Sequence, residues 1–192
     1  MKAIVLMLSL ALLPVTGLRA EDAAPEKPRI AGVEHTLKDG DSTAVVIKGW
    51  TFAKKEEKNL IGWCSSDEGK THTHRIYRLA KDELLGKTGQ DHAQAIYKTL
   101  TEGDEILFET EWKTALSQGG KAARKTAHLK SDVSGDDAKE DLWVIVESKE
   151  FEDRVYLQVV FQESPLDQAK LDLIDKVLNS VQPKATEAKA AP

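Results

Sequence analysis

Two apolar segments near the C-terminal end constrain the fold of this chain more than any other feature. Residues 142–146 read LWVIV, which is apolar on both faces of an extended strand and typical of a strand in the middle of a sheet. In residues 155–161, which read VYLQVVF, Val, Leu, Val and Phe recur with a period of two. Because only the short connection at residues 149–153 separates the two segments, the sequence predicts a central antiparallel hairpin.

Further strands are predicted on the N-terminal side of this hairpin. The Asp39-Gly40 pair predicts a turn between strands near residues 30–37 and 43–52. Residues 106–113 alternate between two sets of side chains, which predicts a half-buried strand with Ile106, Phe108, Thr110 and Trp112 on its inner face. A turn at residues 118–121 leads into another predicted strand over residues 122–131.

Two amphipathic helices complete the predicted secondary structure. In the first, Asp91 is the expected cap, Gly103 suits the end, and the apolar stripe is Ala93, Ile96, Tyr97 and Leu100. In the second, Ser164 is the expected cap, Pro165 the first helical residue and Asp167 part of the first turn, and the stripe is Leu171, Ile174, Leu178 and Val181. We therefore predict an α+β fold, in which a twisted, mainly antiparallel sheet is packed with amphipathic helices in an α/β/α sandwich.

Residues 142–181 place their elements in a characteristic order. An apolar strand and a hairpin are followed by residues 155–161, by Ser164-Pro165 and by a closing helix that ends LNSV. This order resembles the C-terminal end of the PsbP-like and DcrB-like α/β/α sandwiches. The resemblance implies a small exported or lumenal protein without enzymatic activity, often an accessory subunit of a membrane assembly. The chain lacks the lipid-attachment cysteine of the bacterial lipoprotein members.

Residues 1–20 have the composition of a secretory signal peptide. Lys2 precedes an apolar run over residues 3–13, and the small residue Ala20 suits cleavage. The run is shorter than the roughly 20 residues that span a bilayer. We expect export, into the periplasm if the source is bacterial, and no transmembrane segment after cleavage.

The remaining chain is expected to hold one folded unit. Residues 21–28 are polar and contain proline, which predicts a flexible leader to a single α+β domain over residues 29–182. Residues 183–192 are small and charged, which predicts a disordered tail. Loss of Lys2 and Arg19 with the signal peptide lowers Lys plus Arg from 27 to 25 against 32 acidic residues, so the net charge moves from −5 to −7. A nucleic-acid partner, which needs a basic face, is not expected.

The stretch WCSSDEGKTHTH, residues 63–74, contains the single cysteine of the chain. It predicts two strands joined by a turn near Glu68, which would place Cys64 opposite His72, with His74 on the same face. Such a thiolate and two imidazoles suit zinc or copper, and Asp67, His92 or water would be the fourth ligand. The alternatives are an ordinary polar hairpin with a half-buried cysteine, a reactive thiol, or a disulfide between two chains.

No motif of a common enzyme class occurs in the chain. It has no glycine-rich phosphate loop and no GxSxG, HExxH or CxxC sequence. The sequence therefore favours an exported, non-catalytic accessory or binding domain that acts on an envelope protein or a small ligand. A zinc- or copper-binding protein is the alternative, and a thiol-dependent enzyme or hydrolase is the third; no cofactor is expected apart from that metal. Four tryptophans, at positions 50, 63, 112 and 143, would line a ligand groove or pack in the core.

Overall fold

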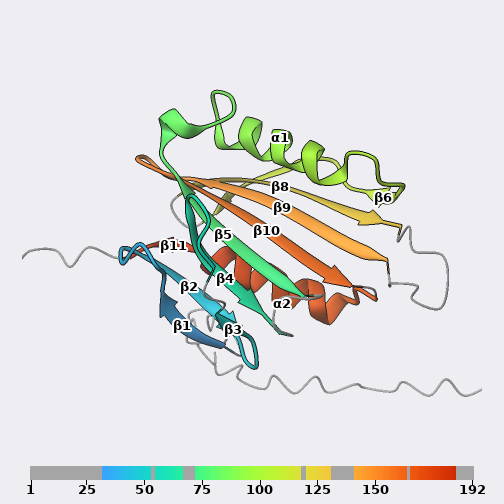
Figure 1. Ribbon diagram of the computed structural model, residues 1–192, viewed down its shortest axis with the longest axis horizontal. Helices are drawn as coiled ribbons and strands as arrows, with labels where there is room; N and C mark the ends of the chain where they lie inside the picture. The colour runs from blue at the N-terminus through green and yellow to red at the C-terminus, as the bar shows by residue number, and fades with distance from the viewer. Residues whose placement is uncertain are drawn as a thin grey trace, which may run out of the picture.

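The structure is a computed structural model that describes residues 32–52, 55–66, 72–117, 120–130, 141–163 and 165–184. The predicted signal peptide and leader lie outside these ranges. In chain order, the described elements are β1 (Gly32–Thr36), β2 (Ser42–Ile47), β3 (Thr51–Phe52), β4 (Leu60–Ser65), β5 (Thr73–Leu79), the 3-10 helix η1 (Lys81–Glu83), α1 (Gly89–Thr101), β6 (Ile106–Glu109), β7 (Lys113–Ser117), β8 (Gly120–Leu129), β9 (Leu142–Glu150), β10 (Val155–Glu163), α2 (Gln168–Ser180) and β11 (Gln182–Pro183) (Figure 1).

A large antiparallel sheet forms the middle layer of the molecule. Its strands follow the order β3-β4-β5-β10-β9-β8-β6, and β7 also pairs with β8. The predicted hairpin is confirmed at its centre, where β9 and β10 are antiparallel neighbours with Val146 opposite Val159. Most residues of both strands are buried, as expected for strands that are covered on both faces.

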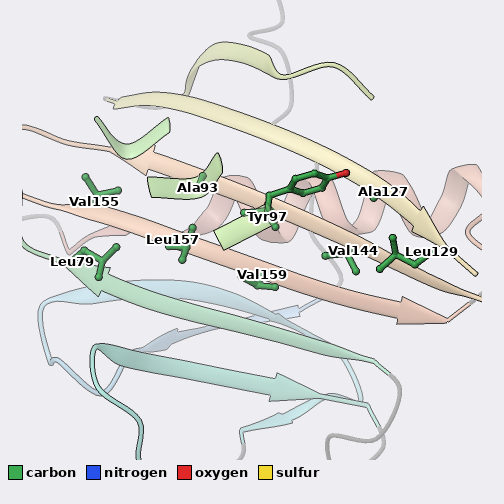
Figure 2. Packing of buried hydrophobic residues seen from close by; sticks show 10 residues of the cluster. Leu79, Ala93, Tyr97, Ala127, Leu129, Val144, Val155, Leu157 and Val159 are labelled. Atoms are coloured by element: carbon green, nitrogen blue, oxygen red, sulfur yellow. The ribbon is translucent and has the colours of Figure 1, made fainter. Parts of the chain in front are cut away.

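The helix α1 covers one face of this sheet (Figure 1). Ala93 and Tyr97 of the helix pack on a floor of strand residues that includes Val144, Leu157 and Val159 (Figure 2). The glycine predicted at the end of the helix, Gly103, has a positive φ of 92°, which suits a glycine at that position. The apolar stripe read from the sequence is therefore the face that α1 buries.

The helix α2 covers the opposite face. Its residues Ile174 and Leu178 pack on Ile145 and Val160, whose side chains point away from α1 because side chains alternate along a strand. The predicted α/β/α arrangement is thus confirmed. Neither of these helices, nor the short η1, is long and apolar enough to cross a membrane.

A small antiparallel sheet, in the order β1-β2-β11, lies on the same side as α2 (Figure 1). The predicted turn at Asp39-Gly40 joins β1 to β2, and Gly40 has a positive φ of 77°. The chain enters β11 directly after α2, and Pro183 pairs with Ser42. The described chain therefore includes residues 183 and 184, the first two of the predicted tail at 183–192; residues 185–192 lie outside the described ranges.

Polar contacts join the two sheets at one end. The buried hydroxyl of Tyr156 lies 2.7 Å from the hydroxyl of Ser42. Next to it, the guanidinium of Arg78 donates to Asp39 at 3.1 Å and to Asp41 at 2.6 Å. The β1–β2 turn is therefore held against β5 and β10 of the large sheet.

The start of α1 differs from the predicted one. Thr88 is the cap, because its side chain accepts a hydrogen bond from the backbone N–H of Asp91 at 3.1 Å. The Asp91 carboxylate in turn accepts from the backbone N–H of Thr88 at 2.9 Å. This reciprocal pair is a capping box, so the prediction of Asp91 as the cap is wrong by three residues.

The start of α2 also differs from the predicted one. The cap is Asp167, whose side chain accepts from the backbone N–H of Lys170 at 2.8 Å, and not Ser164. Pro165 therefore precedes the helix. This later start leaves Leu166 free to pack on the cluster that contains Ile174, which gives the residue before the cap an apolar contact.

The strand predicted over residues 106–113 is interrupted. It ends at Glu109 and the chain resumes pairing with β8 only at β7. A bulge in β6 sets Ile106 opposite Leu129 and Phe108 opposite His128, which are adjacent residues, so Ile106 and Phe108 point to opposite faces. Both are exposed, and the predicted buried face is therefore wrong.

The packing of α2 can be tested with two leucine-to-alanine variants. Leu178 is 0% exposed between α2 and the sheet, whereas Leu85 is 58% exposed. We expect Leu178→Ala to lower the free energy of unfolding by about 2–5 kcal/mol, because it leaves a cavity in the core. Leu85→Ala should change it by less than about 0.5 kcal/mol. Urea denaturation measures both values, and equal effects would contradict the described position of α2.

Candidate functional site

The stretch around Cys64 forms the predicted strand pair, β4 and β5, in a register two residues from the predicted one. Cys64 lies opposite His74 and not opposite His72. A shift of two residues keeps every side chain on its own face, so the apolar pattern does not distinguish the two registers. His72 precedes β5, and its backbone oxygen accepts from the N–H of Ser66 at 3.4 Å.

His74 is buried on the α2 side of the sheet. Its Nε2 lies 2.9 Å from Oε1 of Gln158. The amide nitrogen of Gln158 donates to Glu147 and to the backbone oxygen of Leu178, both at 3.0 Å, so its oxygen is the acceptor and His74 Nε2 carries the proton. Burial lowers the pKa of His74 to about 4, which leaves the imidazole neutral near pH 7.

The contact with Gln158 belongs to a row of polar side chains that runs beneath α2. Gln158, Glu147 and Arg124 are directly opposite one another across β10, β9 and β8. Arg124 donates to Glu147 at 2.7 Å and also to Asp175 of α2. Lys149, fully buried, donates to two carbonyls at the C-terminal end of α2, at 3.0 and 2.8 Å. Burial raises the pKa of the Glu147 carboxyl, although Arg124 opposes the shift. The row positions α2 on the sheet.

Cys64 has the properties of an inert core thiol. It is 2% exposed, and burial raises its pKa to about 12. An activated thiol needs the opposite shift, towards the thiolate. The opposed His74 is already engaged with Gln158. Cys64 and His74 therefore do not form the activated pair of nucleophile and base that a thiol-dependent enzyme needs.

The residues predicted to bind zinc or copper are only partly brought together. Cys64 and His74 are opposed on one face of the sheet. His92 lies on α1, across the sheet, where its Nδ1 accepts from the backbone N–H of Leu85 at 2.9 Å. Asp67 lies outside the described residues. Across the ranges that the structure describes, no three His, Cys, Asp or Glu side chains are grouped so that they could hold a metal ion. The zinc or copper site stays a prediction.

A cleft of about 570 Å³ lies where the small sheet meets the edge of the large one. We call it the inter-sheet cleft. β1 supplies one wall and β3 with β4 the other, and a backbone hydrogen bond from Lys38 N to Ile61 O, 3.0 Å long, joins them. Its volume is that of a small-molecule site. The lining residues are His35, Thr36, Lys38, Phe52, Lys55, Glu56, Leu60, Ile61, Gly62 and Trp63.

Aromatic and cationic groups meet along this cleft. The ring of Phe52 packs edge-on against His35, with centroids 5.1 Å apart. The Lys55 ammonium lies 3.5 Å from the centroid of the Trp63 ring, and the Arg75 guanidinium lies over the same ring at 4.2 Å. Trp63 is 6% exposed, yet its indole N–H has no hydrogen-bond acceptor among the described residues. Because the nitrogen itself is buried, this N–H is an unsatisfied donor inside the protein and is not presented to the surface of the cleft.

A second cleft, of about 270 Å³, lies between α1 and the large sheet, and we call it the helix–sheet cleft. Its floor is apolar, with Leu157 and Val159, and Arg75 and Tyr77 are among its polar residues. Residues 55–59 contribute to both clefts, since Lys55 and Glu56 line the first and residues 57–59 line the second. The inter-sheet cleft is the larger of the two and is our candidate functional site.

Sequence reasoning identified only part of this site. Trp63 was one of the tryptophans expected to line a groove or pack in the core, and it does both. His35 and Lys38 carried no signal, because they reach the cleft only when β1 packs beside β3 and β4. The local sequence pattern likewise did not predict that Phe52 of β3 pairs with Cys64 of β4.

Comparison with known proteins identifies the fold. No family model matches the chain, and no curated protein matches it in sequence. Among solved structures, cyanobacterial PsbP (CyanoP) from Synechocystis superposes with a TM-score of 0.54 at 12% identity, over 91% of this chain and 98% of that one. The Ran-binding protein Mog1p of Saccharomyces cerevisiae superposes with a TM-score of 0.54 at 13% identity, over 79% of this chain and 95% of that one. The PsbP-like fold predicted from residues 142–181 is therefore confirmed.

The buried histidine predicts a dependence of stability on pH. In the unfolded chain His74 takes up a proton below its ordinary pKa of 6.5, whereas the folded protein keeps it neutral until the pH nears 4. The free energy of unfolding should therefore fall between pH 6.5 and 4, by about 3 kcal/mol from this residue. Urea denaturation across this window measures the fall. In His74→Gln, which does not titrate at this position, the fall should be smaller by a similar amount, and equal slopes would contradict the assignment.

The buried cysteine predicts a low reactivity of the native thiol. Because Cys64 is shielded and its pKa is raised to about 12, we expect iodoacetamide at pH 8 to modify it at least about 100-fold more slowly in the native protein than in urea. Mass spectrometry over time measures both rates. Rapid labelling of the native protein would show an accessible thiolate and would restore the reactive-thiol hypothesis.

Proposed function

We propose that this protein is an exported, non-catalytic binding domain that acts on another envelope protein or on a small ligand, and that it binds in the inter-sheet cleft. The observation that carries the proposal is the composition of that cleft. Its wall is apolar and aromatic, and the ammonium groups of Lys38 and Lys55 border it. A concave, mainly apolar surface with a few polar groups to orient the ligand is typical of binding sites.

The fold supports a binding role. Mog1p, which has this fold, is described as a Ran-binding protein, so the same architecture serves to bind another protein in at least one case. At such low sequence identity the likeness concerns the fold, and the role must be argued from the site. The predicted thiol and base, Cys64 and His74, do not line this cleft; both are buried, which raises the pKa of the thiol and lowers that of the imidazole.

Export is proposed from the N-terminal sequence. Residues 1–20 combine Lys2, a short apolar run and Ala20 in the order of a secretory signal peptide. In a bacterial source this signal leads to the periplasm, where a binding partner would be an envelope protein or a small solute.

A fragment screen by NMR tests the proposed site. We would titrate residues 21–192, labelled with ¹⁵N, with neutral, anionic and cationic small molecules. Binding in the inter-sheet cleft should shift the amide signals of Thr36 and Gly62 and the indole signal of Trp63, which Trp63→Phe identifies. Phe52→Ala, which removes one exposed aromatic wall, should weaken this binding by about tenfold or more.

Phe108→Ala is the matched control, because Phe108 is likewise exposed but lies on β6 at the other edge of the sheet. It should leave the binding unchanged. Fragments that bind elsewhere, or that lose affinity in Phe108→Ala and keep it in Phe52→Ala, would contradict the proposed site.

A further inference from the structure

The charged groups of the inter-sheet cleft are mainly cationic. Lys38 and Lys55 contribute two ammonium groups and Glu56 the single carboxylate among the described lining residues. Both lysines are exposed. The ion pairs found for lysines within the described ranges involve other positions, Lys58, Lys81, Lys125 and Lys130. The cleft thus presents a local excess of positive charge on a chain whose net charge is −5.

The charged hydrogen-bonding groups of the cleft are also mainly donors. The ammonium groups of Lys38 and Lys55 can each donate hydrogen bonds to a ligand. The carboxylate of Glu56 is an acceptor. A ligand that brings acceptor oxygens with a negative charge would complement this set, since charge-assisted hydrogen bonds are the strong ones.

The remaining surface of the cleft is flat and apolar. Phe52 and Trp63 contribute aromatic rings, and Leu60 and Ile61 contribute aliphatic side chains. Lys55 and Arg75 already lie over the Trp63 ring, and this attraction holds a positive charge beside the aromatic wall. Phe52, Lys38 and Lys55 line the same cleft, so a ligand whose ring packs on Phe52 can direct an attached acidic group towards a lysine.

We propose that the ligand of the inter-sheet cleft is a small organic anion: a planar, apolar ring system that carries a carboxylate or a comparable acidic group. This inference rests on the proposed function, because it names the chemistry of the ligand for the same site. The acidic group binds the ammonium groups of Lys38 and Lys55, and the ring packs on Phe52 and Ile61. Glu56 disfavours a doubly charged anion.

Three probes with the same ring system and different charge test this assignment. They are 2-naphthoate, 2-naphthamide and 2-naphthylmethylammonium, titrated by NMR into residues 21–192 at neutral pH. We expect 2-naphthoate to bind about tenfold more tightly than the amide, and the ammonium compound to bind more weakly than both. Addition of salt should weaken the binding of the anion and leave that of the amide unchanged.

Charge variants locate the effect. Lys55→Gln and Lys38→Gln should each weaken 2-naphthoate by about threefold to tenfold and leave 2-naphthamide unchanged. Lys58→Gln removes the same charge from the same segment, but Lys58 lines the helix–sheet cleft and pairs with Glu83 at 3.4 Å, so it serves as the control and should have little effect. All three lysines are exposed, and these variants should fold.

The outcomes separate this inference from the proposed function. If the three probes bind equally in the cleft and Phe52→Ala abolishes this binding, the proposed function is kept and the anion assignment is overturned. The anion assignment is also overturned if none of the probes binds while neutral or cationic fragments do bind in the cleft. If Lys58→Gln weakens the binding of 2-naphthoate as much as Lys55→Gln does, the preference for an anion comes from the overall electrostatic field of the protein. That result would also overturn the anion assignment.

Discussion

The burial of the β9–β10 hairpin on both faces is the constraint on which the rest of the structure depends. A strand that is apolar on both sides must be covered by a layer on each side, and each fully buried aliphatic side chain contributes about 1.5–3 kcal/mol. Val144 and Val159 face α1, while Ile145 and Val160 face α2. The two helices and the small sheet satisfy this requirement. With Cys64 as the single cysteine, no internal disulfide can form, so packing must provide the stability.

The polar row beneath α2 orients that helix. Charged side chains are costly to bury, and they are tolerated when every group has a partner. Arg124 bridges Glu147 to Asp175 of α2, and Lys149 binds carbonyls at the C-terminal end of the same helix. Gln158 contacts the helix backbone near its last turn. Because an ion pair of this kind contributes more to geometry than to net stability, we interpret the row as the feature that sets where α2 lies.

The edges of the layered core are where binding surfaces arise. The centre of the sheet is covered, whereas β3 and β4 lie at one edge; the small sheet is held to β5 and β10 by Arg78 and by the contact between Tyr156 and Ser42. The inter-sheet cleft forms where β1 lies beside this edge, and two lysines and several apolar side chains line it. CyanoP and Mog1p share the layers of this fold, and it is the side chains on the layers that distinguish one member from another.

The sequence by itself determined most of the strands, the two helices apart from where they begin, the central hairpin and the α/β/α class, because the period of apolar residues indicates which face of an element is buried. Only the tertiary structure decided the register of Cys64 against His74, since a shift of two residues leaves every face unchanged. The apolar period likewise did not predict the bulge in β6, which places Phe108 on the other face of the strand. The cleft could not be predicted, because His35 and Trp63 are distant in the chain and meet only when the sheets pack together.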